Sequence, residues 1–414
     1  MRAVVVGTGP AGIVAAATLR RLDPTGTVTC LSSEPFPPYS PPAMADHFLT
    51  GRTTTLYWQG ADVASRLGID ERRETVVTGI DADNHEVVVD DGSRLPYEGL
   101  VIASGSRLHA PLQGADLPGV LDFKSLRTAT QLIDRVRAGE VRTALVVGHG
   151  FIGVELSLLL SDLGVEVTVV GRRPWVMPRV LDPVTSSVVE RALQERGVSL
   201  RLGVEATAFV GSPAVTGVRL ADGTDVTADL VVAATGVKPH IEFLAGSAVT
   251  AGWGVHVDDR LMTSVPGIAA AGDVAEASDW LTGERYVHAI FPNAVAQAPL
   301  AAANLLGADL RYEGAEAVNS LKHLGVPVVA MGTITEPEQI LRWRDGDDLR
   351  SVYLRDGRII GAQLAGDIRA AGVYRSLMLR REPVDRFGNA LVEPGFGTGR
   401  VVWDAAHPGA LSPG

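Results

Sequence analysis

Two stretches of the sequence decide the fold. Val4–Leu19 reads V-V-V-G-T-G-P-A-G-I-V-A-A-A-T-L, and Leu145–Leu160 reads L-V-V-G-H-G-F-I-G-V-E-L-S-L-L-L. Each places a G-x-G-x-x-G between a short β-branched run and an apolar stretch with helical spacing. This order of strand, glycine-rich turn and helix is typical of a dinucleotide-binding unit. The chain therefore carries an internal duplication, and we predict an α/β fold with two Rossmann-like domains.

Each glycine of such a turn has a separate task. The first allows a tight turn, the second lets the backbone approach a pyrophosphate, and the third permits close packing of helix on strand. The N–H groups that open the helix then bind the phosphates. Two glycine-rich turns without a ligand are the structural alternative. The predicted binding residues are Gly7, Gly9, Pro10, Ala11 and Gly12 in the first turn and Gly148, Gly150, Phe151, Ile152 and Gly153 in the second.

The two copies differ where their second strand ends. The first ends in C-L-S-S-E, which places Glu34 to accept hydrogen bonds from a ribose diol. The second has Gly171 at that place, followed by Arg172 and Arg173. An acid would repel a 2′-phosphate, whereas a guanidinium can bind it. We therefore predict FAD in the first unit and NADPH in the second, with NADH possible if the arginines only belong to a solvated loop.

Other apolar runs extend the pattern. Val87–Val89, Val101–Ala103, Leu230–Ala233 and Ile268–Ala271 predict strands buried on both faces, hence parallel sheets covered by helices. Beyond Glu316 the strands become short or alternating, with a hairpin signal at Arg355–Arg358 and a helical stretch at Arg369–Arg381. This change predicts a small C-terminal α+β domain.

The composition of the chain argues against several kinds of binding partner. The chain has 414 residues, a formal net charge of −11 and one cysteine. The excess of acids argues against a nucleic-acid partner. No apolar run reaches the roughly 18 residues of a membrane span, and the first apolar run leads into the glycine turn, so we expect neither membrane attachment nor a signal peptide. One cysteine excludes a disulfide framework and a cysteine metal cluster, and it fits a cytoplasmic protein without a metal site.

Three further segments complete a family pattern: V-I-A-S-G-S (Val101–Ser106), V-A-A-T-G-V (Val232–Val237) and G-I-A-A-A-G-D-V (Gly267–Val274). Their order resembles the pyridine nucleotide–disulfide oxidoreductase superfamily, over nearly the whole chain. The resemblance implies an FAD-binding domain at residues 1–110 and 236–315, an NAD(P)H-binding domain inserted at 111–235, and a C-terminal interface domain at 316–414.

The resemblance also implies roles for single residues. Asp273 would bind the ribitol and pyrophosphate region of FAD, and Val77 would meet adenine through its backbone. The helix that begins at Phe291 would point its N-terminus at the flavin, although an Ala-rich helix can also be only packed. Glu155, catalytic by this likeness, would lie near the nicotinamide, or is one charge on a helix face. The implied FAD-binding residues are Pro42, Val77, Ala103, Ser104, Gly105, Gly236, Gly272, Asp273, Phe291, Pro292 and Asn293.

The proline-rich segment Glu34–Gly51 narrows the chemistry. Disulfide-reducing relatives carry redox cysteines in the following helix, and single-cysteine relatives carry a thiol near what is here Pro42. This chain has neither, because its cysteine, Cys30, lies in the strand before Glu34 and is expected to be a small buried hydrophobe. Disulfide chemistry is therefore excluded. The segment resembles the thiol-free branch, which contains rubredoxin reductases, ferredoxin reductases and the flavin portion of nitrite reductases.

In that branch the pattern reads Y-x-R-P-x-L-S-K-x-x-L-x-G. Here Pro41 replaces the arginine and Asp46 replaces the lysine that often reaches flavin N5. Asp46 and His47 are thus candidate catalytic acid/base groups for a small organic substrate, or the helix turns both to solvent. The prolines would fix the wall of the flavin site.

The C-terminal segment resembles the interface domain of the same branch. Its arginines could steer an acidic iron–sulfur protein to the flavin or form a solvated face. They are Arg342, Arg344, Arg369, Arg375, Arg380, Arg381 and Arg386. His407-Pro408, in a Pro/Gly-rich tail, is similar to the C-terminal His-Pro of the disulfide reductases, but it has no cysteine to serve.

The leading hypothesis is an FAD-dependent NAD(P)H oxidoreductase, a monomer or homodimer that passes hydride from NADPH to flavin and electrons on to a ferredoxin or rubredoxin. The second is a flavin-dependent oxidase or tailoring enzyme that acts on a small molecule with Asp46, His47 and His323 near the flavin. The third is an interaction protein that holds flavin without turnover.

Overall fold

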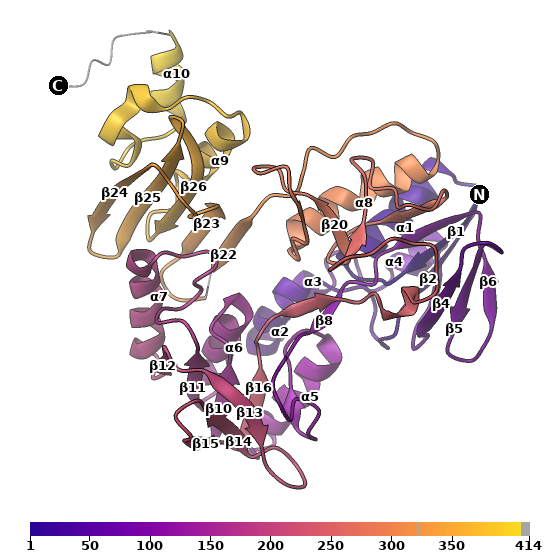
Figure 1. The fold of residues 1–414 in the computed structure, drawn as a ribbon, viewed down its shortest axis with the longest axis horizontal. Helices are drawn as coiled ribbons and strands as arrows, with labels where there is room; N and C mark the ends of the chain where they lie inside the picture. Colours follow the sequence, from indigo (N-terminus) through magenta and orange to yellow (C-terminus); the bar gives the residue numbers. More distant parts are fainter. Residues whose placement is uncertain (322, 407–414) are drawn as a thin grey trace. The chain divides into compact units, whose positions relative to one another are not determined.

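The computed structural model describes residues 1–321 and 323–406, with side chains as far as residue 402 (Figure 1). The chain separates into two compact units. Unit 1 contains Met1–Ala110, Asp122–Asp134 and Gly236–Glu316. Unit 2 contains Pro111–Leu121, Arg135–Thr235 and the chain from Ala317 onward. Each unit thus gathers segments that lie far apart in the sequence.

Unit 1 is built on a five-stranded parallel sheet in the order β19-β7-β1-β2-β3. Val4 and Val5 of β1 are buried, as a strand covered on both faces requires. Helix α1 connects β1 to β2 and packs against α8 (Figure 1). The bounds are β1 Arg2–Val6, α1 Pro10–Leu22, β2 Thr27–Leu31, β3 Asp70–Arg72, β7 Gly99–Ile102, β19 Ile268–Ala270 and α8 Phe291–Leu305.

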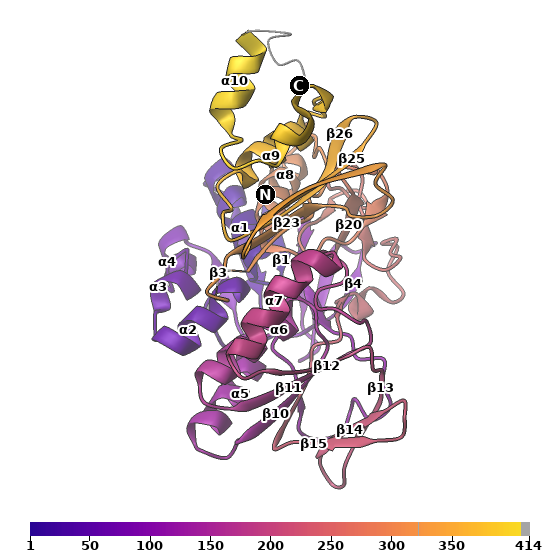
Figure 2. The same cartoon turned by 90° about the vertical axis from the view of Figure 1, so that its left-hand side faces the viewer.

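Unit 2 repeats this architecture with the order β12-β11-β10-β16-β9, again parallel throughout. Helix α6 follows β10 as α1 follows β1. Figure 2 shows α6 and α7 next to each other in unit 2. The two parallel sheets predicted from the duplication are confirmed. The bounds are β9 Val120–Leu121, β10 Thr143–Val147, α6 Phe151–Asp162, β11 Glu166–Gly171, α7 Pro183–Glu195, β12 Ser199–Leu202 and β16 Leu230–Ala233.

A three-stranded antiparallel sheet accompanies each parallel one. Unit 1 has β4 Val77–Asp81, β5 Glu86–Val89 and β6 Arg94–Pro96; unit 2 has β13 Ala206–Val210, β14 Gly217–Leu220 and β15 Asp225–Thr227. The prediction that Val87–Val89 belongs to a parallel sheet is therefore wrong. Val87 and Val89 are buried but Val88 between them is only half-buried, so this strand has one covered face.

Shorter elements complete unit 1. Strands β8 and β17 form one antiparallel pair, and β18, β20 and β21 form another small sheet. Helix α5, Leu126–Arg137, begins in unit 1 and ends in unit 2. The bounds are η1 Pro41–Ala43, α2 Met44–Thr50, α3 Thr53–Leu56, α4 Val63–Leu67, β8 Ser106–Leu108, β17 Val237–Pro239, η2 Glu242–Leu244, β18 Val255–His256, β20 Ala275–Ser278 and β21 Arg285–Tyr286.

The C-terminal part of unit 2 is an antiparallel sheet in the order β22-β23-β26-β25-β24, with α9 packed on β26. The predicted hairpin at Arg355–Arg358 joins β25 to β26. The bounds are β22 Val318–Leu321, β23 Val328–Gly332, β24 Gln339–Asp345, β25 Asp348–Arg355, β26 Arg358–Ala365, α9 Ala371–Leu379, η3 Asp385–Leu391 and α10 Thr398–Ala406.

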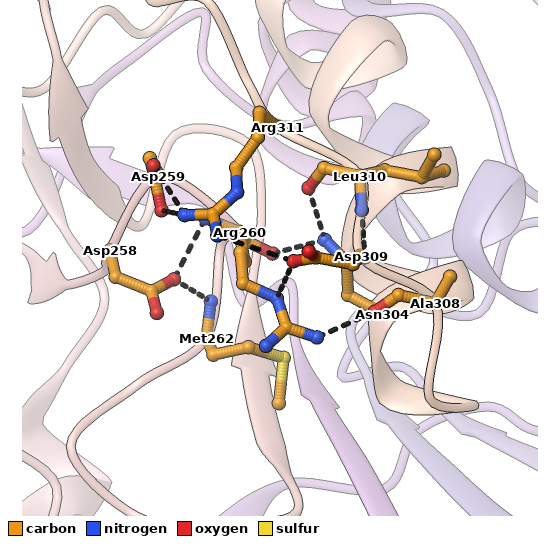
Figure 3. A network of polar contacts seen from close by, with 9 residues as sticks. All are labelled: Asp258, Asp259, Arg260, Met262, Asn304, Ala308, Asp309, Leu310 and Arg311. Atoms are coloured by element: carbon orange, nitrogen blue, oxygen red, sulfur yellow. Dashed lines mark hydrogen bonds and ion pairs between the residues drawn. The ribbon is translucent and has the colours of Figure 1, made fainter.

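A polar network in unit 1 fixes the chain as it leaves α8 (Figure 3). The buried Asn304 donates through Nδ2 to the carbonyls of Arg260 and Leu310 and accepts from the N–H of Leu310. Arg311 pairs with Asp259 at 2.6 Å, and Arg260 pairs with Asp309 at 3.2 Å. A satisfied buried amide with two peripheral ion pairs holds the segment after α8 against Asp259 and Arg260.

Among the helices that the structure describes, none is long and apolar enough to cross a membrane.

Candidate functional site

The first glycine turn has the shape that a pyrophosphate requires. Gly7 has φ +99°, and a Cβ there would collide with the carbonyl of Ala103. A Cβ on Gly12 would collide with the carbonyl of Gly7, because α1 packs closely on β1. Gly9, in contrast, has no atom within 4 Å of its Cβ position. Two glycines are closed in by protein and the middle one faces open space, which fits a backbone approached by a ligand.

The second turn in unit 2 repeats this geometry. Gly148 has φ +118° and lies against the carbonyl of Ala234, and Gly153 lies against the carbonyl of Gly148. Gly150 again has no atom within 4 Å of its Cβ position. The fold of each turn requires the outer glycines, whereas the open middle position is what the approach of a ligand to the backbone requires.

Both helices begin without a side-chain cap. Gly9 and Gly150 are the N-cap residues of α1 and α6, and neither first turn contains an acid. Helix α7 differs, because the side chain of Asp182 caps it by accepting a 2.8 Å hydrogen bond from the N–H of Thr185. The starts of α1 and α6 therefore leave N–H groups and a partial positive charge for an anion.

Glu34 follows β2 in a network that includes the proline-rich segment. Its Oε2 accepts a 2.7 Å hydrogen bond from the hydroxyl of Tyr39, and its Oε1 accepts a 3.3 Å bond from the N–H of Arg127. The N–H of Leu126 donates to the Tyr39 oxygen at 3.0 Å. Burial and the Glu34 charge hold the pKa of Tyr39 well above its usual value. A carboxylate has about four acceptor positions, so Glu34 retains capacity for a ribose diol.

Asp273 is paired with a lysine that the sequence patterns did not single out. Its Oδ2 accepts 2.7 Å from the Ser106 hydroxyl and lies 2.9 Å from Nζ of Lys124. Both charged side chains are about four-fifths buried, at 23% exposure for Lys124 and 18% for Asp273. This pair places a cation and an anion beside the predicted ribitol site. No motif predicts it, because Lys124 and Asp273 are far apart in the sequence.

The remaining predicted FAD residues also belong to unit 1. The hydroxyl of Ser104 donates to the carbonyl of His240, and the N–H of Gly272 donates to the side chain of the buried Gln297. Gly105, Gly236 and Gly272 all have positive φ. Ala103 directly follows β7 and is buried, and Val77 is the half-buried first residue of β4.

The start of α8 is uncapped and free of acids, and Pro292 lies in its first turn. Phe291 packs edge-on against Trp58, with ring centroids 5.3 Å apart. The Asn293 side chain, however, donates to the carbonyl of Glu316 and accepts from its N–H. The Asn293 side chain therefore holds the chain after α8.

Asp46 and His47 lie on α2 beside Arg52 and Thr55. The Asp46 carboxylate accepts 3.2 Å from the hydroxyl of Thr55 and lies 3.9 Å from the Arg52 guanidinium. Nδ1 of His47 lies 3.1 Å from the carbonyl of Arg52. Pro42, in η1, is exposed. These local contacts involve one carboxylate oxygen of Asp46 and one ring nitrogen of His47, and a catalytic role for either residue stays a prediction.

Cys30 lies within β2 at 1% exposure. Burial raises the pKa of the Cys30 thiol far above its usual value. The nearby carboxylates of Glu71 and Asp70 raise this pKa further. The nucleophilic thiolate is therefore suppressed.

In unit 2 the strand β11 ends at Gly171, and the exposed Arg172 and Arg173 follow. Arg172 lies 3.7 Å from Glu205, and both side chains are more than half exposed. The half-buried Glu155, Phe151 and Ile152 lie in the first turns of α6.

The C-terminal arginines do not form a uniform positive face. Arg344 donates to the carbonyl of Gly346. Four others form ion pairs with acids of unit 2: Arg342 with Asp182, Arg369 with Asp367, and Arg380 and Arg386 with Glu382. His323 is half-buried, and His407-Pro408 lies outside the described residues.

Among the described residues, no group of three or more His, Cys, Asp or Glu side chains could hold a metal ion.

Comparison with known proteins identifies the family of the chain. Residues 1–300 match the family described as pyridine nucleotide-disulphide oxidoreductase. The rubredoxin-NAD(+) reductase of Pseudomonas putida is 30% identical over 83% of this chain and 93% of its own. An NADH oxidase of Methanocaldococcus jannaschii is 27% identical over 90% of this chain and 89% of its own.

The crystal structure of a covalent putidaredoxin reductase–putidaredoxin complex superimposes with a TM-score of 0.87 at 25% identity, covering 98% of this chain and 99% of that chain. Fold class and family resemblance are both confirmed. The chain, which has one glycine turn of the nucleotide-binding type in each unit, belongs to the pyridine nucleotide–disulphide oxidoreductase family.

Proposed function

We propose that this protein is an FAD-dependent oxidoreductase that takes hydride from NADPH and passes electrons to a ferredoxin- or rubredoxin-type protein without a redox thiol. The carrying observation is the pair of glycine turns, each with a middle glycine that faces open space and an uncapped helix behind it. Each unit therefore has one glycine turn that could bind one cofactor.

The residues of unit 1 suit FAD. The open Gly9 and the start of α1 would receive the pyrophosphate, Glu34 the adenosine ribose, and Asp273 with Lys124 the ribitol. Bound FAD supplies a ring that accepts hydride from a reduced nicotinamide and releases electrons singly or in pairs. The protein has to orient the two rings and exclude water, since hydride transfer needs no protein base.

The preference for NADPH is supported by the residues that end β11. Gly171 offers no carboxylate to a ribose diol, while Arg172 and Arg173 offer guanidinium donors to a 2′-phosphate. Glu205 lies near Arg172, but a pair so exposed contributes little, so a phosphate can displace it.

A protein acceptor is supported by the names of the relatives and by the state of Cys30. Relatives are called rubredoxin-NAD(+) reductase and putidaredoxin reductase. The buried Cys30 cannot relay electrons as a thiolate. Electrons would therefore leave the flavin directly.

A second candidate is direct reduction of oxygen. A relative carries the name NADH oxidase, and Asp46 stands where the thiol-free branch has a lysine. Rapid reoxidation in air, at a rate that a ferredoxin or rubredoxin does not increase, would favour this candidate.

The test is steady-state turnover of the FAD-loaded protein with NADPH or NADH and with ferredoxin, rubredoxin or oxygen as acceptor. The proposal expects NADPH to give the higher kcat/KM and an iron–sulfur or rubredoxin-type protein to outpace oxygen. Arg172→Ala should lower the preference for NADPH about tenfold, the loss of one charge-assisted hydrogen bond. Equal turnover with both nucleotides in the unaltered protein would remove the basis for the NADPH assignment.

A further inference from the structure

The imidazole of His149 fills the space beyond the end of β11. A Cβ placed on Gly171 would have Cγ, Nδ1 and Cδ2 of this ring as its three nearest atoms, and it would clash with them. His149 is the residue between the first two glycines of the second turn. Gly171 and His149 are therefore a matched pair, and the ring occupies the place where a Rossmann unit carries its ribose-binding acid.

Backbone contacts hold both members of this pair. The carbonyl of His149 accepts a 2.8 Å hydrogen bond from the N–H of Met177, a buried residue with φ +52°. The carbonyl of Gly171 accepts a 3.1 Å bond from the N–H of Val204. One hydrogen bond thus holds the backbone of the turn that carries the ring, and the other holds the strand end next to it.

The ring offers one hydrogen-bond donor toward this strand end. Nε2 is buried without a partner among the described residues, whereas Nδ1 is among the ring atoms nearest the Gly171 Cβ position. Burial, and then the charge of Arg172, lower the pKa of His149, so the ring is neutral near pH 7. A proton on Nδ1 rather than Nε2 avoids a buried N–H without an acceptor.

We propose that Nδ1–H of His149, together with Arg172 and Arg173, binds the 2′-phosphate of NADPH. This inference rests on the proposed function and adds to it the residue that reads the nucleotide's 2′ position. A 2′-phosphate only accepts hydrogen bonds, and these three side chains only donate here. A ribose diol instead needs an acceptor, and Gly171 at the end of β11 supplies no carboxylate.

The test compares two replacements of His149 in the FAD-loaded protein. His149→Leu removes the donor, and His149→Gln keeps a side-chain N–H of similar reach. The measured quantity is the ratio of kcat/KM for NADPH to that for NADH. We expect His149→Leu to lower this ratio about tenfold, the value of one charge-assisted bond, and His149→Gln to restore most of it.

The double variant His149→Gly with Gly171→Asp provides a second test of the proposal. It opens the space that the ring fills and introduces the acid, so the preference should reverse toward NADH. Gly171→Asp alone is the matched control, and its effect should be smaller, because the ring opposes the new side chain. FAD content and circular dichroism report on folding of each variant.

The outcomes separate the two proposals. If neither nucleotide bleaches the flavin of the unaltered protein, the proposed function fails and this inference with it. If flavin is reduced but His149→Leu and His149→Gln leave the ratio unchanged, or the double variant keeps its preference for NADPH, the inference alone is overturned.

Discussion

The hydroxyl of Tyr39 donates a 2.7 Å hydrogen bond to Oε2 of Glu34, five residues earlier in the chain. The same oxygen of Tyr39 accepts from the N–H of Leu126 at the start of α5. The proline-rich segment thereby orients the carboxylate proposed to bind the ribose of FAD. The proline-rich segment can therefore position Glu34 through Tyr39 without a cysteine.

Replacing Tyr39 by Phe should weaken FAD binding. The change leaves Glu34 without its hydroxyl donor and the N–H of Leu126 without its acceptor. We expect the FAD dissociation constant to rise about tenfold, as for a hydrogen bond to a charged group. Flavin fluorescence during titration of the apoprotein measures it. Tyr286→Phe, at a tyrosine of unit 1 that is 55% exposed, is the matched control. An unchanged constant for Tyr39→Phe would show that Tyr39 does not position Glu34.

Lys124→Met should be more harmful than Lys124→Arg. Methionine leaves the Asp273 carboxylate, which is about four-fifths buried beside the proposed ribitol site, without its cation, and a charge left in that state is costly. We expect faster loss of FAD on dilution and a lower unfolding temperature for Lys124→Met. Arginine preserves the charge and should recover most of both. If the methionine variant retains FAD as well as the arginine variant does, the pair has no part in cofactor binding.

Cys30→Ala should leave turnover nearly intact, because the thiol is buried in β2 and its raised pKa keeps it protonated. Truncation of one small buried side chain should cost about 1 kcal/mol of unfolding free energy. Steady-state kinetics and urea unfolding measure the two quantities. A loss of turnover in a folded, flavin-loaded Cys30→Ala variant would contradict thiol-free electron transfer.

Asp279 should make the stability of unit 1 dependent on pH. Burial raises the pKa of this carboxyl, but hydrogen bonds from His288 at 2.7 Å and from the N–H of Thr282 outweigh that effect and lower it overall. A lowered folded-state pKa means that the stabilisation is present above the unfolded value of about 3.9 and is lost as pH falls through the folded value.

Asp279→Asn should therefore destabilise the protein at pH 7 by about 1–3 kcal/mol, the range for a hydrogen bond to a charged group. The difference from the unaltered protein should shrink as pH falls below 4. Urea unfolding at a series of pH values tests this expectation. A difference that stays constant from pH 7 to pH 3 would mean that the charge of Asp279 does not contribute.

The sequence predicted those features that one short segment enforces by itself. The roles of Gly7, Gly9 and Gly12 follow from backbone geometry within a few residues, and the structure has each as the turn requires. The parallel sheets followed from unbroken β-branched runs such as Val4–Val6.

Other features depend on distant segments, which a sequence pattern does not bring together. Lys124 meets Asp273 only because Asp122–Asp134 folds with unit 1. The space beside Gly171 is filled by His149 because two strands end side by side. Val87–Val89 was assigned to the wrong kind of sheet because three valines in a row do not reveal that one of them faces partly to solvent.

The sequence also did not predict the directions in which individual side chains point. Whether Asp46 and His47 face a ligand depends on the rotation of α2, and the structure shows them held by Arg52 and Thr55. Helical spacing predicts which residues share a face but not which partners that face meets.

Anaerobic titration of the FAD-loaded protein with NADPH tests the central claim most directly. The account predicts stoichiometric uptake of FAD by the apoprotein, and then loss of the flavin's visible absorbance upon addition of NADPH, with the colour restored by an oxidised ferredoxin or rubredoxin. A folded protein that takes up no FAD, or a bound flavin that keeps its colour in excess NADPH, would contradict it.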